Sequence, residues 1–316
     1  GTAALHLAFQ AIDLRQGDEV LVPSITYVST FQAISATGAI PVACDVNNIN
    51  CLIDLQDAKR KISKKTKAIV PVHFAGGVGE LDKIYKFAKI NKLRVIEDAA
   101  HAFGTIYKKK RIGSFGDIVC FSFDGIKNIT SGEGGCIVTK DKNVINKVKT
   151  ARLLGVENDS DKRILNKRSW KFDVKNQGWR YHQSNLMAAI GIAQLKKSNL
   201  LFKKRQDLAK QYDYNLKNNN HILTLSQDYN NVVPHIYVIK VKDIKIREKI
   251  QKQLKANGIE YGLHYFPNHL LTLYKKKHIT LKNSEMLVNQ LITLPLHPNL
   301  NKIDINVICK IINTCN

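Results

Sequence analysis

The chain alternates short apolar runs with amphipathic stretches through its N-terminal part, and this alternation constrains the fold more than any other feature. Apolar and β-branched runs typical of buried strands lie at residues 20–23, 40–45, 68–72, 95–96 and 119–123. Strands that are apolar on both faces and alternate with helices are typical of a parallel sheet with helices on both sides. The sequence therefore predicts an α/β fold built on a largely parallel sheet.

Helical spacing of apolar residues fills the intervals between these runs. We expect the first helix to begin near Thr2, with Thr2 as its N-cap. Further helices are expected at 26–37, at 81–91, from Ser184 through Leu195, and at 247–257. A strand-like run at 235–239 precedes the last of these, so the C-terminal part mixes strands and helices. We place a large domain at 1–195 and a small α+β domain at 196–316.

Lysine and arginine outnumber the acidic residues by 49 to 26, which gives a formal net charge of +23. Such a balance can indicate a nucleic-acid-binding protein, which is the alternative from a different functional class. The basic residues are scattered, however, and do not alternate with aromatic residues as in single-strand binders. We therefore interpret the charge as solvated surface and expect neither a nucleic-acid partner nor a membrane partner.

Six cysteines are spread over the chain without a CxxC spacing, which argues against a zinc site and against a disulfide framework. No apolar run approaches the roughly 18 residues that a membrane-spanning helix needs, and no signal-peptide pattern is evident. These patterns lead us to expect a cytoplasmic protein without a bound metal.

Two chemically distinctive side chains follow predicted strands. Lys127 comes shortly after the run at 119–123, and Asp98 ends an earlier run next to Glu97. Open α/β sheets bind ligands at the carboxyl ends of their strands. An amine and an acid in that place are what pyridoxal phosphate chemistry needs, namely a Schiff-base lysine and a partner for the pyridinium nitrogen. Glu97 would point to the opposite face of the strand, so Asp98 is the favoured acid. A purely structural role, as a cap of the following helix, is the alternative for Asp98.

These segments resemble the DegT/DnrJ/StrS family of nucleotide-sugar aminotransferases, which depend on pyridoxal 5'-phosphate (PLP). The resemblance also runs through the stretches 1–7, 17–20, 71–73, 113–117 and 294–298. It covers essentially the whole chain and implies a fold-type I transferase. Such an enzyme has a large domain with a mostly parallel mixed sheet covered by helices, plus a smaller α+β C-terminal domain. Because Gly1 opens directly on a motif that relatives carry further along, we expect the large domain to be N-terminally incomplete here.

The resemblance implies roles for the residues around PLP. Lys127 would form the Schiff base with the cofactor and then move a proton between substrate and cofactor, and Asp98 would keep the ring nitrogen protonated. Tyr27 would stack on the ring, and His101 would donate a hydrogen bond to its phenolic oxygen. The residues alone leave a structural alternative open for the last two, which is core packing for Tyr27 and a helix-start role for His101.

The cofactor phosphate would be bound by a helix start and two further side chains. Gly1, Thr2 and Ala3 offer backbone N–H groups at a helix N-terminus, and Ser122 adds a hydroxyl. Arg180 stands where relatives carry an asparagine that reaches the partner's site. An arginine can bind a phosphate through two hydrogen bonds, whereas the alternative is a surface salt bridge.

The resemblance assigns substrate binding to Thr26, His264, Tyr265 and His269. No metal site is expected at these histidines, because no carboxylate lies nearby in the sequence and Pro267 breaks helical spacing.

The implied enzyme is a homodimer with shared active sites. It would transfer an amino group, with L-glutamate as donor, to C3 or C4 of a nucleotide-linked keto-deoxy sugar, for cell-surface polysaccharides such as lipopolysaccharide. Some relatives are instead sugar dehydratases that use PLP or its amine form (PMP) and carry histidine in place of the Schiff-base lysine. Such a dehydratase is the alternative function, and Lys127 argues against it.

Overall fold

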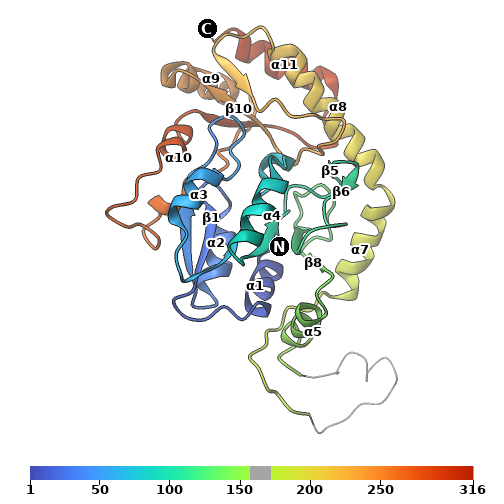
Figure 1. Cartoon of the computed structure of the whole chain (residues 1–316). Helices are drawn as coiled ribbons and strands as arrows, with labels where there is room; N and C mark the ends of the chain where they lie inside the picture. The colour runs from blue at the N-terminus through green and yellow to red at the C-terminus, as the bar shows by residue number, and fades with distance from the viewer. Residues whose placement is uncertain (157–171, 316) are drawn as a thin grey trace.

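The computed structural model describes residues 1–156 and 172–315. A six-stranded sheet with the order β2-β1-β3-β4-β7-β8 forms its N-terminal part (Figure 1). The strands are β1 (Glu19–Pro23), β2 (Ile40–Cys44), β3 (Thr66–Ile69), β4 (Arg94–Asp98), β7 (Ile118–Ser122) and β8 (Gly135–Thr139). All neighbouring strands are parallel except β7 and β8. The predicted sheet is therefore confirmed, and β8 makes it mixed.

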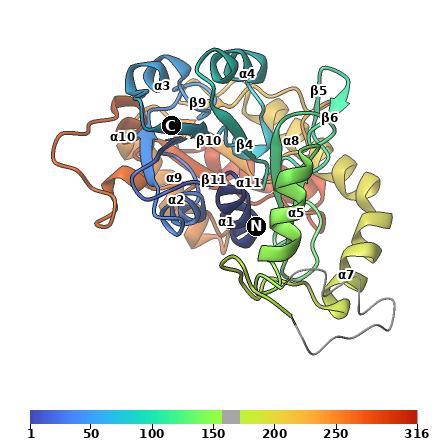
Figure 2. The same cartoon turned by 60° about the horizontal axis from the view of Figure 1, so that its bottom comes forward.

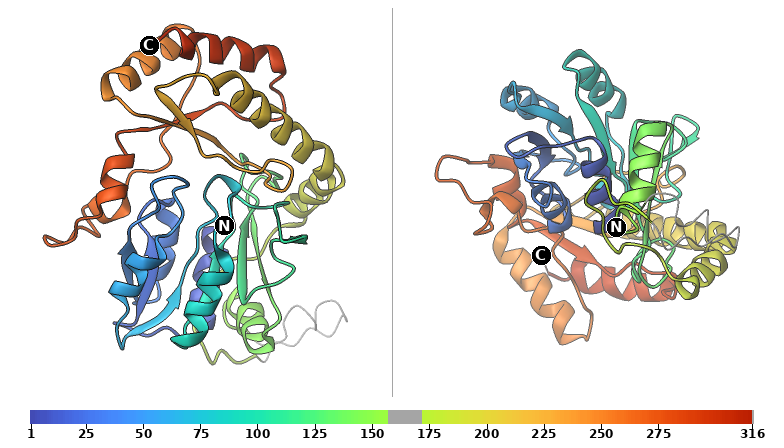
Figure 3. Two further views of the ribbon diagram at one scale, coloured as in Figure 1. Left: turned by 45° about the horizontal axis from the view of Figure 1, so that its top comes forward. Right: turned by 90° about the horizontal axis from the view of Figure 1, so that it is seen from below.

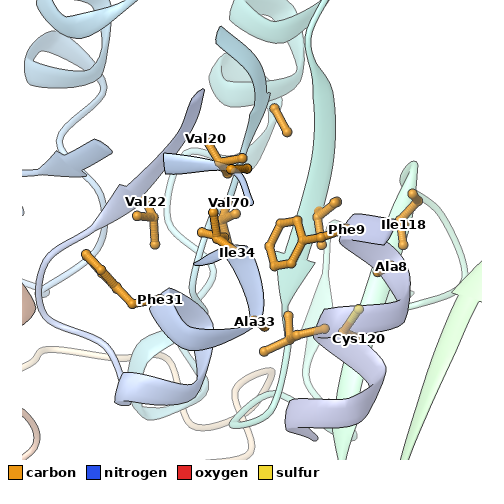
Figure 4. Close-up of a cluster of buried hydrophobic side chains, with 14 of the residues drawn as sticks. Ala8, Phe9, Val20, Val22, Phe31, Ala33, Ile34, Val70, Ile118 and Cys120 are labelled. Atoms are coloured by element: carbon orange, nitrogen blue, oxygen red, sulfur yellow. The ribbon is translucent and has the colours of Figure 1, made fainter. Parts of the chain in front are cut away.

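Helices cover both faces of this sheet (Figure 2). One layer holds α1 (Thr2–Ala11), α2 (Val28–Ser35) and α5 (Lys142–Ala151), and the other holds α3 (Leu55–Lys61) and α4 (Leu81–Ile90). The strands serve both layers because successive side chains point to opposite faces: Val20 and Val22 pack toward the first layer, and Leu21 packs toward the second. Figure 4 shows Phe9 and Phe31 against the strands of the first face. Both faces are thus apolar, which leaves the strand ends for polar chemistry.

The C-terminal part is built on a three-stranded antiparallel sheet with the order β11-β10-β9. Its strands are β9 (Ile222–Thr224), β10 (Tyr237–Val241) and β11 (Leu291–Leu294), and its helices are α8 (Ser198–Leu216), α9 (Ile244–Ala256), α10 (Lys282–Leu287) and α11 (Lys302–Asn313). A second core joins α8, α9 and α11 to the sheet. The expected small α+β part is confirmed.

Two consecutive helices, α7 (Asn185–Lys196) and α8, run along one side of the molecule and connect its two parts (Figure 3). The domain boundary between residues 195 and 196 falls next to the end of α7 and stays a prediction. The smaller elements are the hairpin of β5 (Ile106–Tyr107) and β6 (Lys110–Arg111) and the short 3-10 helices Phe74–Gly76 and Asn268–Leu270. In the described ranges, no helix combines the length and the apolarity that crossing a membrane requires.

Element ends differ from the predicted ones for identifiable reasons. Gly1 is the N-cap residue of α1 and Thr2 makes no capping bond, so the expectation for Thr2 was wrong. Helix α9 begins earlier than predicted because Asp243 caps it, accepting hydrogen bonds from N–H groups of its first turn. Strand β10 begins only at Tyr237, which leaves His235 in the preceding loop. That loop position matters for the site described next.

Candidate active site

A pocket of about 370 Å³ lies at the carboxyl ends of β4 and β7, where the two parts of the chain meet. This volume is within the usual range of small-molecule sites. The predicted site residues that line it are Gly1, Thr2, Thr26, Tyr27, Asp98, His101, Ser122, Lys127, His264 and Tyr265. Three others, Ala3, Arg180 and His269, are not part of its lining. The fold therefore brings most of the predicted residues together from five separate stretches of sequence.

Asp98 is the last residue of β4 and is 5% exposed. Its Oδ2 accepts a hydrogen bond of 2.7 Å from the Thr30 hydroxyl, and its Oδ1 accepts one of 3.2 Å from the Ala100 N–H. Thr30 lies on α2, so the carboxylate is held on the face of the sheet that α2 covers. Two donors fix the side chain in place while it lines the pocket.

Glu97 points to the opposite face, as the strand period predicts. It is fully buried, and its Oε2 lies 2.7 Å from His73 Nε2. Its Oε1 accepts a hydrogen bond of 2.6 Å from the Tyr85 hydroxyl, and burial together with this carboxylate raises the pKa of Tyr85. Glu97 does not line the pocket. Of the two neighbouring acids, Asp98 alone is available for chemistry there.

Lys127 lies in the loop after β7, and its amine is in the same pocket as Asp98. The register explains this proximity, because β4 and β7 are paired and Asp98 lies opposite Cys120. Burial lowers the pKa of the Lys127 amine, although the negative charges of Asp98 and Asp124 act in the opposite direction. A larger neutral fraction makes a lysine a better nucleophile and base at neutral pH.

The N-terminal end of α1 closes one side of the pocket. A Cβ atom on Gly1 would lie 2.8 Å from Ser122 Cβ, so only glycine lets the helix approach β7 this closely. No side chain caps the first turn of α1, whose N–H groups have no partner within the helix. Free N–H groups at a helix N-terminus attract anions, and the Ser122 hydroxyl lies beside them. This end of the pocket suits a phosphate group.

The opposite side of the pocket is aromatic. His101 Nδ1 accepts a hydrogen bond of 3.3 Å from the Ala75 N–H, so its other nitrogen carries the proton and donates to the Tyr265 hydroxyl at 3.0 Å. Burial, and then the nearby Lys127, lowers the pKa of His101 well below its usual value. The Tyr27 and Tyr265 rings lie 5.8 Å apart, and Tyr27 is 57% exposed at the mouth. His101 is therefore a neutral donor and not a cation.

The structure does not bring His269, Arg180 or Ala3 to the pocket. His269 is 2% exposed, and both ring nitrogens are occupied, by the Ser24 hydroxyl at 2.7 Å and by Glu285 at 3.0 Å. It therefore supports the fold behind the site, because a buried ring with both nitrogens bonded is not free to bind a substrate. Arg180 is exposed and pairs through its backbone with Leu153, outside this pocket.

Two residues that were not predicted contact the site. His235 Nε2 lies 3.4 Å from Lys127 Nζ, and Arg205 on α8 donates a hydrogen bond of 2.9 Å to the His235 carbonyl. The local pattern around His235 reads as a strand and gives no signal of a role. Arg205 carried a signal, because it falls on the apolar stripe of its helix between Phe202 and Leu208. A charged residue in such a stripe is unusual and can be noticed from the sequence.

The arrangement fits PLP. The Lys127 amine and the Asp98 carboxylate follow two paired strands. The uncapped start of α1 lies beside the Ser122 hydroxyl. The neutral histidine donor His101 lines the same pocket. Among residues 1–156 and 172–315, no three His, Cys, Asp or Glu side chains gather as they would around a metal ion.

Comparisons with known proteins agree with this chemistry. The model of the DegT/DnrJ/EryC1/StrS aminotransferase family matches residues 1–313. GDP-perosamine synthase from Escherichia coli O157:H7 is 34% identical over 99% of this chain and 83% of that protein. An uncharacterized protein from Methanocaldococcus jannaschii is 36% identical over 99% of this chain and 84% of that protein.

Solved structures are similar over the same extent. Helicobacter pylori PseC, an aminotransferase involved in the biosynthesis of pseudoaminic acid, matches with a TM-score of 0.91 and 29% identity, covering 99% of this chain and 84% of that one. The PLP form of a putative sugar aminotransferase from Streptococcus pneumoniae matches with a TM-score of 0.88 and 28% identity, covering 99% and 84%. The expected fold and cofactor are thereby confirmed.

Proposed function

The chain belongs to the DegT/DnrJ/EryC1/StrS aminotransferase family, and on that premise we propose that it transfers an amino group from L-glutamate to a nucleotide-linked keto-deoxy sugar. It is a PLP-dependent sugar aminotransferase. The observation that carries the proposal is that the Lys127 amine and the Asp98 carboxylate lie in one pocket. When bound, PLP supplies the electron sink that makes the substrate C–H bond acidic.

Lys127 and Asp98 take the proton-handling roles. Lys127 would hold the cofactor through its amine and would move a proton at the substrate carbon. Its lowered pKa supports this role, because a neutral amine is needed to accept the proton. Asp98 stabilises a proton on the ring nitrogen, and the Thr30 hydroxyl holds its carboxylate in place.

The remaining pocket residues bind and orient. Gly1, Thr2 and Ser122 bind the phosphate, as the uncapped helix start supports. Tyr27 packs on the ring, and the Nε2–H of His101 would donate to the ring oxygen in place of the Tyr265 hydroxyl. We keep Ala3 as a further N–H donor of the first turn.

Substrate binding is assigned to Thr26, His264 and Tyr265. His264 Nδ1 is 2.9 Å from the Thr293 hydroxyl, and burial lowers its pKa to about 4, so a neutral ring faces the substrate. His269 supports this site indirectly, through its hydrogen bond with the Ser24 hydroxyl.

We also propose that the enzyme is a cytoplasmic homodimer. Helix α7 buries none of its residues within the chain. Its exposed apolar side chains are Leu186 (80%), Ile190 (46%), Ile192 (58%) and Leu195 (54%). A second copy would cover this surface, as an exposed apolar helix face suggests. In such a dimer, Arg180 reaches the phosphate in the partner's site.

The product feeds cell-surface polysaccharide, including lipopolysaccharide. The name of the relative GDP-perosamine synthase supports an amino-sugar product. The sugar dehydratase alternative is disfavoured because the pocket holds an amine at position 127 instead of an imidazole.

The test is a turnover assay on the purified protein with PLP, L-glutamate and a panel of keto-sugar nucleotides. Formation of 2-oxoglutarate with an equal amount of amino sugar is the expected result. Product that lacks an oxygen but carries no new amine would support the dehydratase instead. Light scattering of the same sample tests the dimer, and a monomer at micromolar concentration would contradict it.

A further inference from the structure

His235 lies against the reactive lysine although it comes from the other part of the chain. It is in the loop before β10 and is 4% exposed. Its Nε2 is 3.4 Å from Lys127 Nζ, and its ring lies 4.4 Å from the His101 ring. Its Nδ1 is buried and has no hydrogen-bond partner among the described residues. The contact with Lys127 is therefore the main polar interaction of this ring.

The surroundings of His235 favour a neutral imidazole. Burial lowers the pKa of His235 well below its usual value. The nearby charges or potential charges of four side chains lower it further, namely those of His101, Lys127, Arg205 and His264. A neutral ring next to an amine can accept a hydrogen bond through Nε2 when its proton is on Nδ1. It cannot compete with Lys127 for a second positive charge. His235 thus offers Lys127 a fixed acceptor.

A fixed acceptor determines where the amine points. A neutral lysine amine has two N–H bonds and one lone pair, and rotation about its last carbon–nitrogen bond is otherwise free. When one N–H donates to His235 Nε2, this rotation is stopped, and the lone pair takes one of the two remaining tetrahedral positions, both of which are directed away from His235. The lone pair is the atom-level feature that accepts the substrate proton.

Arg205 holds this arrangement together. It is 3% exposed and donates hydrogen bonds to the carbonyls of His235 at 2.9 Å, Leu296 at 3.0 Å and Ile126 at 3.4 Å. Within the described part of the chain it contacts carbonyls and no carboxylate, and burial lowers its pKa to about 10. Ile126 directly precedes Lys127. One guanidinium therefore links the backbone beside the lysine to the backbone of its acceptor.

We propose that His235, held by Arg205, is a positioning residue that accepts an N–H of Lys127 and thereby aims the amine's lone pair at the substrate carbon. This rests on the proposed role of Lys127 in transamination. It deepens that function, because the released lysine needs a defined resting geometry to carry a proton in the correct direction.

Two substitutions at position 235 distinguish a positioning role of the side chain from a packing role. His235→Phe fills the same space and can pack on His101 but accepts no hydrogen bond. His235→Gln keeps an acceptor oxygen near the place of Nε2. Should His235→Phe fail to fold, His235→Asn replaces it, because its shorter amide is polar but does not reach Lys127.

The first measurement needs no cofactor. The full chain without PLP is reductively methylated over a range of pH, and labelling of Lys127 is read by peptide mass spectrometry. Loss of the acceptor removes a partner of the ammonium form, so the midpoint for Lys127 should fall by about one pH unit in His235→Phe, a roughly tenfold change in the neutral-to-charged ratio. The midpoint should stay at the wild-type value in His235→Gln. An unchanged midpoint in His235→Phe would overturn the proposal.

The second measurement is the single-turnover rate with L-glutamate. We expect the His235→Phe variant still to bind PLP covalently. Its proton-transfer rate should be about 30-fold to 100-fold lower, since a factor of ten in rate corresponds to about 1.4 kcal/mol in the activation barrier. His235→Gln should recover most of this loss. Equal losses in both variants, with equal Lys127 midpoints, would show that His235 only packs. If no sugar nucleotide is aminated, the proposed function fails, yet the labelling midpoint still tests His235.

Discussion

The two walls of the pocket carry charge in different ways. The wall formed by strand ends of the six-stranded sheet holds Asp98 and Lys127, which are ionisable and lie in one pocket. The wall formed by the C-terminal part holds His264 and Tyr265, and His235 lies behind it against Lys127. Burial lowers the pKa of both histidines and raises that of the tyrosine, so this wall is neutral. The difference assigns proton chemistry to the first wall and orientation to the second.

Replacing the amine of the charged wall should have the largest effect. Lys127→Ala removes the only group proposed to bind PLP covalently, so we expect turnover to fall by about four orders of magnitude or more. Borohydride reduction followed by mass spectrometry should find no cofactor attached to the variant. The exposed Lys64→Ala variant is the control and should keep the wild-type adduct. A reduced adduct on Lys127→Ala would reject this assignment.

The two acids of β4 should respond differently. Asp98→Asn keeps the size of the side chain but removes the charge that stabilises the ring proton, so turnover should fall by several orders of magnitude while PLP still binds. Glu97→Gln should be much milder in turnover. It should cost about 1–3 kcal/mol of stability, because His73 and Tyr85 lose a charged partner. Single-turnover rates and urea unfolding measure the two effects. Collapse of the rate in Glu97→Gln with normal Asp98→Asn would reverse the comparison.

We expect the neutral wall to make the folded protein less stable in acid. The pKa of His264 is lowered from 6.5 to about 4. Below pH 6.5 the His264 ring therefore binds a proton in the unfolded chain but not in the folded chain. The free energy of unfolding should fall as the pH decreases from 6.5 toward 4, by up to about 3 kcal/mol. His264→Gln should flatten this part of the unfolding curve, measured by urea titration at each pH. The exposed His278→Gln serves as control. An equally steep curve in His264→Gln would show that its ring is not kept neutral.

The link between the walls should give the smallest effect. Arg205→Lys keeps the charge, but one ammonium cannot reach three carbonyls in the geometry of a guanidinium. We expect a loss of about 1–2 kcal/mol in the free energy of unfolding. The exposed Arg60→Lys variant should change it by less than about 0.5 kcal/mol. Equal stabilities of the two variants would mean that Arg205 does not join the walls.

The charged wall could be predicted from sequence because its signals are local. A buried strand followed by a lysine, and a second strand ending in an acid, each lie within a few residues, and the strand period separates Asp98 from Glu97. The largely parallel sheet was predicted correctly for a similar reason, because continuously apolar runs that alternate with helical patterns are local features of the sequence. These features need only the neighbouring residues to be understood.

The neutral wall could not be predicted in the same way, because its contacts join distant residues. His269 was expected to bind substrate, yet its partner Ser24 is 245 positions away in sequence and fixes it behind the site. His235 meets Lys127 across 108 positions. Arg205 was the exception, since an arginine within an apolar helical stripe could have been noticed. Long-range partners of buried polar groups are decided by packing, which a local pattern does not contain.

The three hydrogen bonds that Arg205 donates to backbone carbonyls also have a mechanical consequence. They connect the loop beside Lys127, the loop before β10 and the segment after β11 through one buried side chain. Arg205, His235 and Leu296 all belong to the C-terminal part, so the hydrogen bond to the Ile126 carbonyl is the one of the three that crosses to the N-terminal part. We expect this crossing bond to restrain relative motion of the two parts beside Lys127, so a motion that opens the pocket should grow with distance from Arg205. We expect the widest excursion on the side of Tyr27, whose ring is already 57% exposed.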